Sequence, residues 1–202
     1  QTQADPKKVK VFVTLENNTD SAQKGTLDLA LHEYGNPSAV VWESMLLGEI
    51  SPSSTNTFEF EASVSEARLW ELAGYQGAGE ENTALYEARA TFSNNDIQDS
   101  QSQRFGFRWF DMQEKDGDKR FYLNGKRVVI LAAMTRGYWP TNGIFATPEM
   151  AQRDKQAMQE LGLNMMLLHR AIGQPPVMEY ADKSGLLTYE EPGGYRVAPN
   201  PE

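Results

Sequence analysis

The chain has 202 residues, 40% of them hydrophobic, which suffices for one large domain or two small ones with a packed core. Its formal net charge of -9 and its isoelectric point near 4.8 disfavour nucleic acid as a partner, because phosphate binding needs clustered Lys and Arg. The absence of cysteine excludes disulfides, thiol nucleophiles and cysteine-based zinc sites.

Short segments of alternating polarity fill the first hundred residues. Positions 9, 11, 13 and 15 are Val or Leu and alternate with mostly polar residues, which predicts a half-buried strand. Similar runs lie at 26–31, 40–45, 58–62 and 84–92, with turn residues at 17–20, 35–38 and 51–54 between them. This spacing, without a helix between the runs, predicts a two-sheet sandwich, and we expect an immunoglobulin-like fold without the disulfide.

A polar stretch rich in Gln and Ser follows this region and leads into residues 104–110, which are predicted to close the sandwich. Residues 113–119 are all polar or glycine, and we place the domain boundary there. The predicted domains are 1–112 and 113–202. Within the boundary segment, Asp116-Gly117-Asp118 lacks the further ligands of a calcium loop and is predicted to be a hairpin turn.

Helical and strand periods alternate in the second part. The apolar run 128–134 predicts a buried strand and is far shorter than the roughly twenty residues that span a bilayer, so no membrane partner is expected. Thr147 and Pro148 predict a helix start and Gly162 its end, and the residues that recur at helical spacing on one face are Met150, Asp154, Ala157, Met158 and Leu161. Residues 163–168 predict a strand covered on both faces. A second helix from Pro175 to about Ser184 and a strand at 186–190 complete a pattern that implies parallel strands with right-handed crossovers.

Four segments in succession carry a family resemblance. They are the Phe-Gly-Phe-Arg of 105–108, the Leu-Asn-Gly-Lys of 123–126, the helix-to-strand segment 154–164, and the segment 180–191 that ends in Glu-Glu. The series resembles glycoside hydrolase family 2, which contains β-galactosidases, β-glucuronidases and β-mannosidases. The resemblance implies a multidomain β plus α/β protein, in which an immunoglobulin-like sandwich precedes the first three strands and two helices of a (β/α)8 barrel.

The resemblance also implies an enzyme that hydrolyses O-glycosidic bonds with retention, by means of two carboxyl groups about 5 Å apart. Glu190 and Glu191 are consecutive, and neighbouring residues of a strand point to opposite faces, so they make a poor pair. The family's catalytic glutamates follow later barrel strands and would lie beyond Glu202. We therefore assign no catalytic residue and expect this part of a larger enzyme to be inactive alone. Glu191 is expected to line the barrel mouth, to support a neighbouring strand, or to be a structural carboxylate.

Side chains that follow the first two barrel strands would lie on the catalytic face. Arginine can hydrogen-bond hydroxyl or carboxylate groups, and tryptophan can stack on a sugar ring. Packing of the loop at Trp139 and ion pairs from the histidine and arginine to Glu190 or Glu191 are the structural alternatives. The candidate substrate-binding residues are Arg136, Trp139, His169, Arg170 and Glu191, with Tyr138 beside them.

The chain departs from the family at two places. Where many members carry Asn-Arg-His after the first barrel strand, this chain has Met134-Thr135-Arg136. Where they carry arginine and histidine after the second strand, the matching positions are Leu167 and Arg170, and His169 is one place out of register. The sugar contacts of the galactosidases are therefore not carried over, and the substrate stays open.

Other features indicate neither a metal nor a cofactor. His32 is predicted to be a solvent-facing or hydrogen-bonded strand histidine, and with only two histidines we expect no metal site. The expected partner is a carbohydrate. An open sheet of apolar parallel strands would leave unpaired edges, which predicts self-association through that half of the chain. We favour a periplasmic or extracellular location.

Two other functions are compatible with the sequence. The sandwich could be a non-catalytic carbohydrate-binding or adhesion module that uses Trp42, Trp70 or Tyr75. Alternatively, the chain could be a small α/β protein that is complete as written.

Overall fold

The computed structural model describes residues 7–73, 83–135, 143 and 145–191. The chain folds into two compact units. Unit 1 comprises the residues up to Trp70 together with Ala84–Trp109, and unit 2 comprises the residues between these segments together with those from Phe110 onward. Each unit has its own hydrophobic core.

The larger sheet of unit 1 has four antiparallel strands in the order β3-β2-β5-β6. The strands are β2 (Gln23–Glu33), β3 (Asn36–Ile50), β5 (Tyr86–Ser93) and β6 (Gln98–Phe105). Strands β2 and β3 form a hairpin whose turn is Tyr34 and Gly35. The predicted turn at 35–38 is therefore too long, because β3 already begins at Asn36. Pro37 lies inside β3, and a strand at the edge of a sheet tolerates proline because one side of it needs no hydrogen-bond partner.

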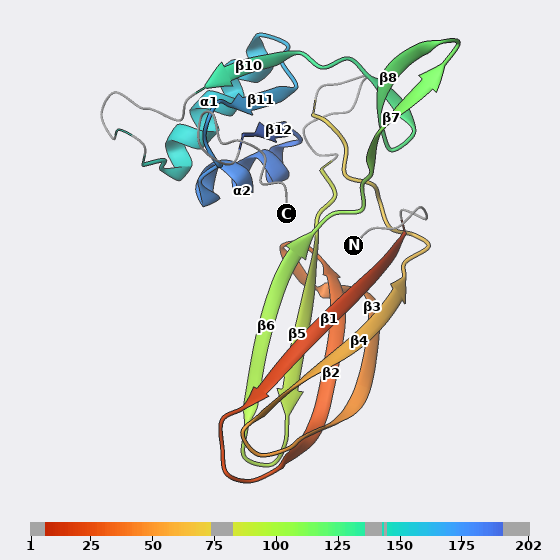
Figure 1. The fold of residues 1–202 in the computed structure, drawn as a ribbon, viewed down its shortest axis with the longest axis vertical. Coiled ribbons are helices and arrows are strands. Elements are labelled where there is room, and N and C mark those ends of the chain that lie inside the picture. The colour runs from red at the N-terminus through yellow and green to blue at the C-terminus, as the bar shows by residue number, and fades with distance from the viewer. Residues whose placement is uncertain (1–6, 74–82, 136–142, 144, 192–202) are drawn as a thin grey trace, which may run out of the picture. The chain divides into compact units, whose positions relative to one another are not determined.

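The smaller sheet of unit 1 is the antiparallel pair β1 (Lys8–Asn17) and β4 (Ser54–Ser63). Its ribbons lie over the larger sheet in Figure 1. Val9 of β1 and Phe60 of β4 are buried in one cluster with Leu27, Leu29 and Leu31 of β2, which are less than 2% exposed. The two sheets therefore pack face to face, as the alternating pattern predicts.

The last strand of the larger sheet lies earlier than predicted. Strand β6 is the Gln- and Ser-rich stretch that sequence analysis read as a connection, and the predicted closing segment 104–110 contributes only its first two residues. Residues 98–103 are exposed on both faces of the strand, so no apolar alternation marks them. The strand exists because its backbone pairs with β5 from Tyr86↔Phe105 to Ser93↔Gln98.

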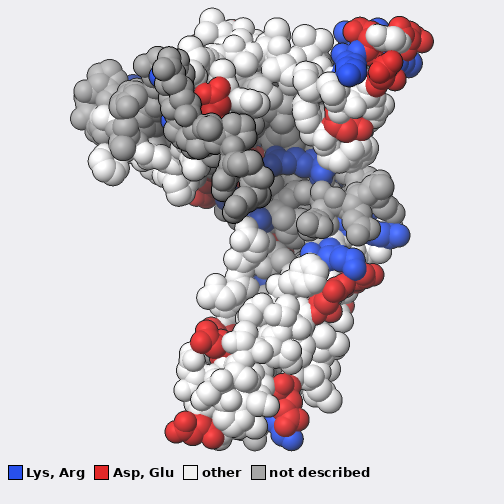
Figure 2. Space-filling model, in the orientation of Figure 1, with Lys and Arg blue, Asp and Glu red and all other residues white. Residues whose placement is uncertain are grey.

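Unit 2 begins with a three-stranded antiparallel sheet, β7-β8-β9. Its strands are β7 (Phe110–Lys115), β8 (Asp118–Leu123) and β9 (Lys126–Val128). The polar segment in which the domain boundary was placed is a hairpin whose turn is Asp116-Gly117, as predicted for those residues. Asn124 and Gly125 both have positive φ, 53° and 75°, which is the geometry of a tight hairpin turn. In Figure 2 charged side chains gather over the β7–β8 hairpin at the upper right, and this accounts for its polar sequence.

The rest of unit 2 alternates strands and helices (Figure 1). Strands β10 (Ala132–Thr135), β11 (Met165–Leu168) and β12 (Leu187–Glu190) form a parallel sheet in that order. Helices α1 (Pro148–Glu160) and α2 (Pro175–Ser184) connect them. Thr147 caps α1 and accepts a hydrogen bond from Met150 N at 3.3 Å, and Gly185 ends α2 in the left-handed conformation. Both helix boundaries therefore follow the predicted capping residues.

Three burial predictions for unit 2 are wrong. The run 128–134 is not one buried strand, since it is divided between β9 and β10 and Met134 is 62% exposed. Strand β11 buries Met166 and Leu168 but only half-buries the residues on its other face, because α1 and α2 pack on one side of the sheet. On α1 the buried residues are Ala151, Lys155 and Met158, whereas Leu161, expected on the apolar face, is 75% exposed.

Candidate functional site

The carboxyl ends of the three parallel strands meet at one edge of their sheet. The register pairs Thr135 with Leu168 and Leu168 with Glu190, so the segments that follow the three strands leave the sheet side by side. His169 N also donates to Thr135 O at 2.8 Å, which extends the pairing of β10 and β11 by one residue. Loops at this edge of parallel sheets are where α/β proteins carry their binding residues, so it is the candidate functional site.

Glu191, the first residue after β12, holds the residues that follow β11. Its Oε2 accepts a hydrogen bond from Arg170 N at 2.9 Å and lies 3.0 Å from His169 Nδ1. Both side chains of the His169–Glu191 pair are partly exposed, at 23% and 36%. Because Nδ1 faces the carboxylate, a neutral His169 that donates through Nδ1 keeps Nε2 as an acceptor for a ligand.

Glu190 contacts the same segment from one residue earlier. Its Oε2 accepts a hydrogen bond from Gly173 N at 3.3 Å. The carboxylates of Glu190 and Glu191 therefore each accept from a backbone N–H of residues 169–173, and these bonds hold the segment between β11 and α2. Arg170 has a left-handed backbone with φ 57°, a conformation that a non-glycine residue adopts at some cost and that such bonds help to maintain.

Asn164 is a structural residue of this sheet that sequence analysis did not single out. It is 6% exposed; its Oδ1 accepts from Leu131 N at 2.9 Å and its Nδ2 donates to Val129 O at 2.8 Å. Its backbone C=O accepts from Leu187 N at 3.0 Å. Asn164 therefore joins the segments that enter all three parallel strands. The only signal in the sequence is an asparagine directly before an apolar strand.

The structure brings three of the five candidate residues together. His169, Arg170 and Glu191 lie at the carboxyl edge of the sheet, whereas Arg136 and Trp139, with Tyr138, lie outside the described residues. The contact that was kept as a structural alternative, between His169 Nδ1 and Glu191 Oε2, is present at 3.0 Å. Glu191 contacts the Nδ1 side of the His169 ring and the backbone N–H of Arg170, and Nε2 lies on the other side of that ring.

The two described tryptophans proposed for a carbohydrate-binding sandwich lie in or against the core of unit 1. Trp70 is completely buried, with the guanidinium of Arg108 stacked 4.4 Å from its ring centroid. Trp42 is half-buried against the core, and Tyr75 lies outside the described residues. Trp70 therefore supports packing of unit 1 and is not open to a sugar, and Trp42 is partly exposed.

His32 is not a solvent-facing or hydrogen-bonded histidine, as predicted, but is 9% exposed and its Nδ1 has no hydrogen-bond partner. The pairing of β2 with β3 is irregular at Leu31/His32 and His32/Glu33, whereas its pairing with β5 is regular and places His32 opposite Glu87. Within the described ranges, no three His, Asp or Glu side chains lie close enough together to hold a metal ion.

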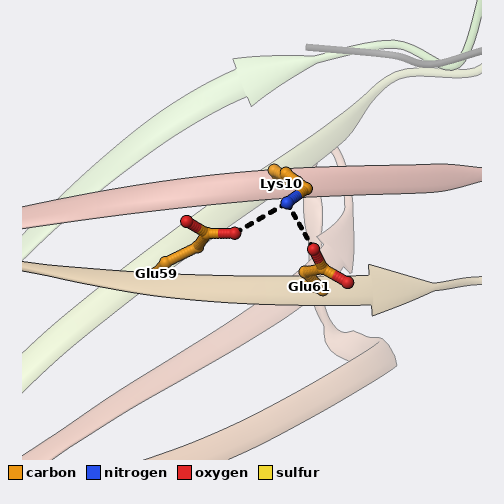
Figure 3. Close-up of polar contacts among 3 residues, drawn as sticks. All are labelled: Lys10, Glu59 and Glu61. Carbon is orange, nitrogen blue, oxygen red and sulfur yellow. Dashed lines mark hydrogen bonds and ion pairs between the residues drawn. The ribbon is translucent and has the colours of Figure 1, made fainter.

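A charged cluster in unit 1 is structural. Lys10 Nζ contacts Glu59 Oε1 at 2.8 Å and also Glu61 Oε1, across the pair β1–β4 (Figure 3). The hydrogen bond with Glu59, followed by that with Glu61, raises the pKa of Lys10 above its ordinary value. The hydrogen bond from Lys10 lowers the pKa of Glu61. All three side chains are on the outer face of the strands, so the cluster stabilises their pairing.

Known proteins resemble the chain in sequence. It is 27% identical over 129 residues to a putative beta-glucuronidase of Formosa agariphila, covering 63% of this chain and 14% of that protein. It is 25% identical over 140 residues to a beta-galactosidase of Thermoanaerobacterium thermosulfurigenes, covering 69% and 18%. The chain thus spans less than a fifth of the length of these relatives. No helix within the described ranges is long and apolar enough to cross a membrane.

Solved structures share the fold. A beta-glucuronidase of Bacteroides uniformis matches with a TM-score of 0.74 and 23% identity, over 91% of this chain and 21% of that one. A putative beta-galactosidase from Bacteroides fragilis matches with a TM-score of 0.76 and 18% identity, over 90% and 25%. The family model described as Glycosyl hydrolases family 2 matches residues 1–108, more than half of the chain. The chain therefore belongs to glycosyl hydrolases family 2.

Proposed function

We propose that these 202 residues are part of a retaining glycoside hydrolase, in which unit 1 is an immunoglobulin-like sandwich and unit 2 contains the start of a (β/α)8 barrel. The observation that carries the proposal is the carboxyl edge of the sheet β10-β11-β12, where His169, Arg170 and Glu191 follow adjacent parallel strands. Barrel enzymes carry their chemistry at this edge, on loops from several strands. Membership of the family supports the same activity.

In this proposal the five candidate residues contact or position a sugar. His169 offers its Nε2 to a hydroxyl group, and Arg170 offers guanidinium donors to a hydroxyl group or a carboxylate. Glu191 positions both residues through Arg170 N and His169 Nδ1. Arg136 and Trp139 belong to the loop after β10, where Trp139 would stack on the ring.

The substrate class that we propose is a β-glucuronide or β-galactoside, by analogy with the names of the relatives. Arg170 favours the glucuronide, because a guanidinium binds a carboxylate by two parallel hydrogen bonds. A galactoside has no such group, so the two substrates should depend on Arg170 to different degrees.

The catalytic pair is proposed to lie outside these 202 residues. A retaining glycosidase needs one carboxyl group as acid and one as nucleophile, about 5 Å apart and open to the substrate. Glu190 and Glu191 instead accept hydrogen bonds from the backbone of the β11–α2 segment. The chain alone is therefore expected to bind sugar weakly and to hydrolyse no glycoside.

The proposal is tested with nitrophenyl β-glucuronide, β-galactoside and β-mannoside. We expect the protein encoded by the complete reading frame to hydrolyse one of them with retention of anomeric configuration, followed by NMR, and the 202-residue chain to hydrolyse none. Inversion, or no turnover by the complete protein with any of the three, would refute the proposed activity. Turnover by the 202-residue chain that is lost in Glu190→Gln or Glu191→Gln would refute the proposed location of the catalytic pair.

If the substrate is a glucuronide, Arg170→Ala in the complete protein should raise KM for the glucuronide more than tenfold, since a charge-assisted bidentate contact contributes more than about 1.4 kcal/mol. A control variant, Arg153→Ala, changes an exposed arginine on α1 and should leave KM unchanged. Equal KM values for Arg170→Ala and Arg153→Ala would contradict the assigned contact.

A further inference from the structure

The two sheets of unit 1 differ in width. Strands β1 and β4 form the smaller sheet, and they face a sheet of four strands. Tyr86 and alternate residues after it on β5 face the core. Their partners on β6 include Asp99, Gln101 and Gln103, which therefore lie on the same inner face of the sheet. These three residues are nevertheless exposed, since no described strand covers them. The inner face of the larger sheet is thus left open along β6.

A groove of about 640 Å³ occupies this place. One wall is β1 and the turn after it, from Val11 to Thr19, and the other is β6, from Asp99 to Gln103. The floor consists of core side chains of the larger sheet, and it is apolar. The floor residues are Leu27, Leu29, Ile50, Ala88, Ala90 and Phe92.

Both walls of the groove are strand edges. Strand β1 pairs only with β4, and β6 pairs only with β5, among the residues that the structure describes. In an antiparallel pair, alternate residues of a strand direct their N–H and C=O groups away from the partner strand. Half of the peptide groups of β1 therefore point toward the groove, as they would toward a further strand of the sheet. A free strand edge is a template for an added strand.

The dimensions and chemistry of the groove match one extended strand. The β1 wall from Val11 to Asn17 has seven residues, which at about 3.3 Å per residue is roughly 23 Å. Inward-facing Val11 and Val13 are half-buried, so apolar side chains of an added strand would complete their burial. The charged residues among the described lining residues are Glu16 and Asp99, which favours Lys or Arg in the occupant.

We propose that this groove binds an extended polypeptide strand that pairs with β1, with apolar residues at alternate positions facing the floor and Lys or neutral polar residues between them. The added strand would give the smaller sheet a third strand and cover the inner face of β6. An oligosaccharide fits less well, because the floor aromatic Phe92 is only 7% exposed, and the exposed Phe12, which also lines the groove, is on the outer face of β1 with Lys10. The groove lies wholly in unit 1, so the proposal is independent of the glycosidase proposal.

The experiment uses the 202-residue chain and a fluorescent eight-residue peptide in which Val alternates with Lys and Thr. We expect saturable binding by fluorescence anisotropy, together with slower hydrogen exchange of amides 11–17 in the complex. A peptide of the same composition without alternation should bind at least tenfold more weakly. A peptide with Glu in place of Lys should also bind about tenfold more weakly at low salt, a difference that salt reduces.

Two variants locate the site. Gln101→Trp places a large side chain in the groove and should weaken peptide binding at least tenfold, whereas Gln98→Trp, on the outer face of the same strand and outside the groove lining, should not. Both positions are exposed, so neither change should unfold the chain. Three results would overturn the proposal: no saturable binding up to about 1 mM peptide, equal effects of the two variants, or binding of an oligosaccharide in place of the peptide. A dimer that is lost in Gln101→Trp would assign the groove to a second copy and would also overturn it.

Discussion

Substitution of Gly185 tests the packing that supports the candidate site. Gly185 ends α2 with φ 67°, and its C=O accepts a hydrogen bond from Ala73 N at 3.0 Å within unit 2. A Cβ at this position would lie 2.5 Å from Ala73 N and 2.8 Å from Glu71 O. Both are backbone atoms and cannot rotate away, so Gly185→Ala must move the backbone of one segment or the other.

The expected loss in free energy of unfolding for Gly185→Ala is the sum of three contributions. A left-handed alanine costs about 1–2 kcal/mol relative to glycine. Forcing an extra carbon into a filled space costs about 1–3 kcal/mol more, and weakening one hydrogen bond about 1 kcal/mol. Gly185→Ala should therefore lower the free energy of unfolding of unit 2 by about 3–6 kcal/mol. Gly162→Ala is the matched control, because Gly162 has φ 70° but no atom within 4 Å of its Cβ position, and it should cost only the first contribution.

Urea unfolding followed by far-UV circular dichroism gives the difference between the two variants. Hydrogen exchange of the amides of α2 and β12 assigns the loss to unit 2, since a chain of two units need not unfold in one step. If the two variants differ by less than about 0.5 kcal/mol, the contact between Gly185 and residues 71–73 is absent in solution and the reasoning is refuted.

Three further predictions concern other parts of the molecule. Asn164→Ala should lower the free energy of unfolding by about 2–4 kcal/mol, because two half-buried backbone groups lose their partners; a urea midpoint that implies less than about 1 kcal/mol would contradict this. Because the pKa of Glu61 is lowered below its ordinary value of 4.5, its charged form stabilises the folded chain at pH values above 4.5, and this stability is lost as the pH falls through the folded-state pKa. The urea midpoint should therefore fall less between pH 6 and pH 3 in Lys10→Met than in the unmodified chain. Equal falls in the two proteins would exclude the effect. Exposed Met134 and Tyr189 should drive self-association of the 202-residue chain, and a monomer at micromolar concentration by light scattering would count against it.

Elements with strong end signals were predictable from the sequence. Thr147 with Pro148 marks the start of α1, and Pro175 and Gly185 mark the limits of α2, because caps satisfy backbone groups locally. Strand β6 was missed, since its inner face is not covered by any described strand and therefore carries Gln and Asp where a covered strand carries apolar residues. Its pairing with β5 is a tertiary property.

The candidate site was predictable in part. The strand order and the rule for parallel sheets placed His169, Arg170 and Glu191 at one edge, and the structure gives their contacts. Sequence reasoning did not identify Asn164, because its importance lies in three segments that only the folded sheet brings together. The direction in which the Glu190 and Glu191 carboxylates turn also depends on the neighbouring segment, since its backbone N–H groups supply their partners.

The sequence by itself determined the family, the β-rich first part, both helices and the parallel strands, because periodicity, caps and turns are local properties of the chain. Only the tertiary structure decided which faces are covered. It divided the apolar run 128–134 between two strands, buried His32, and left a groove between β1 and β6. Burial depends on what packs against a segment, and a pattern of residues along one strand does not contain that information.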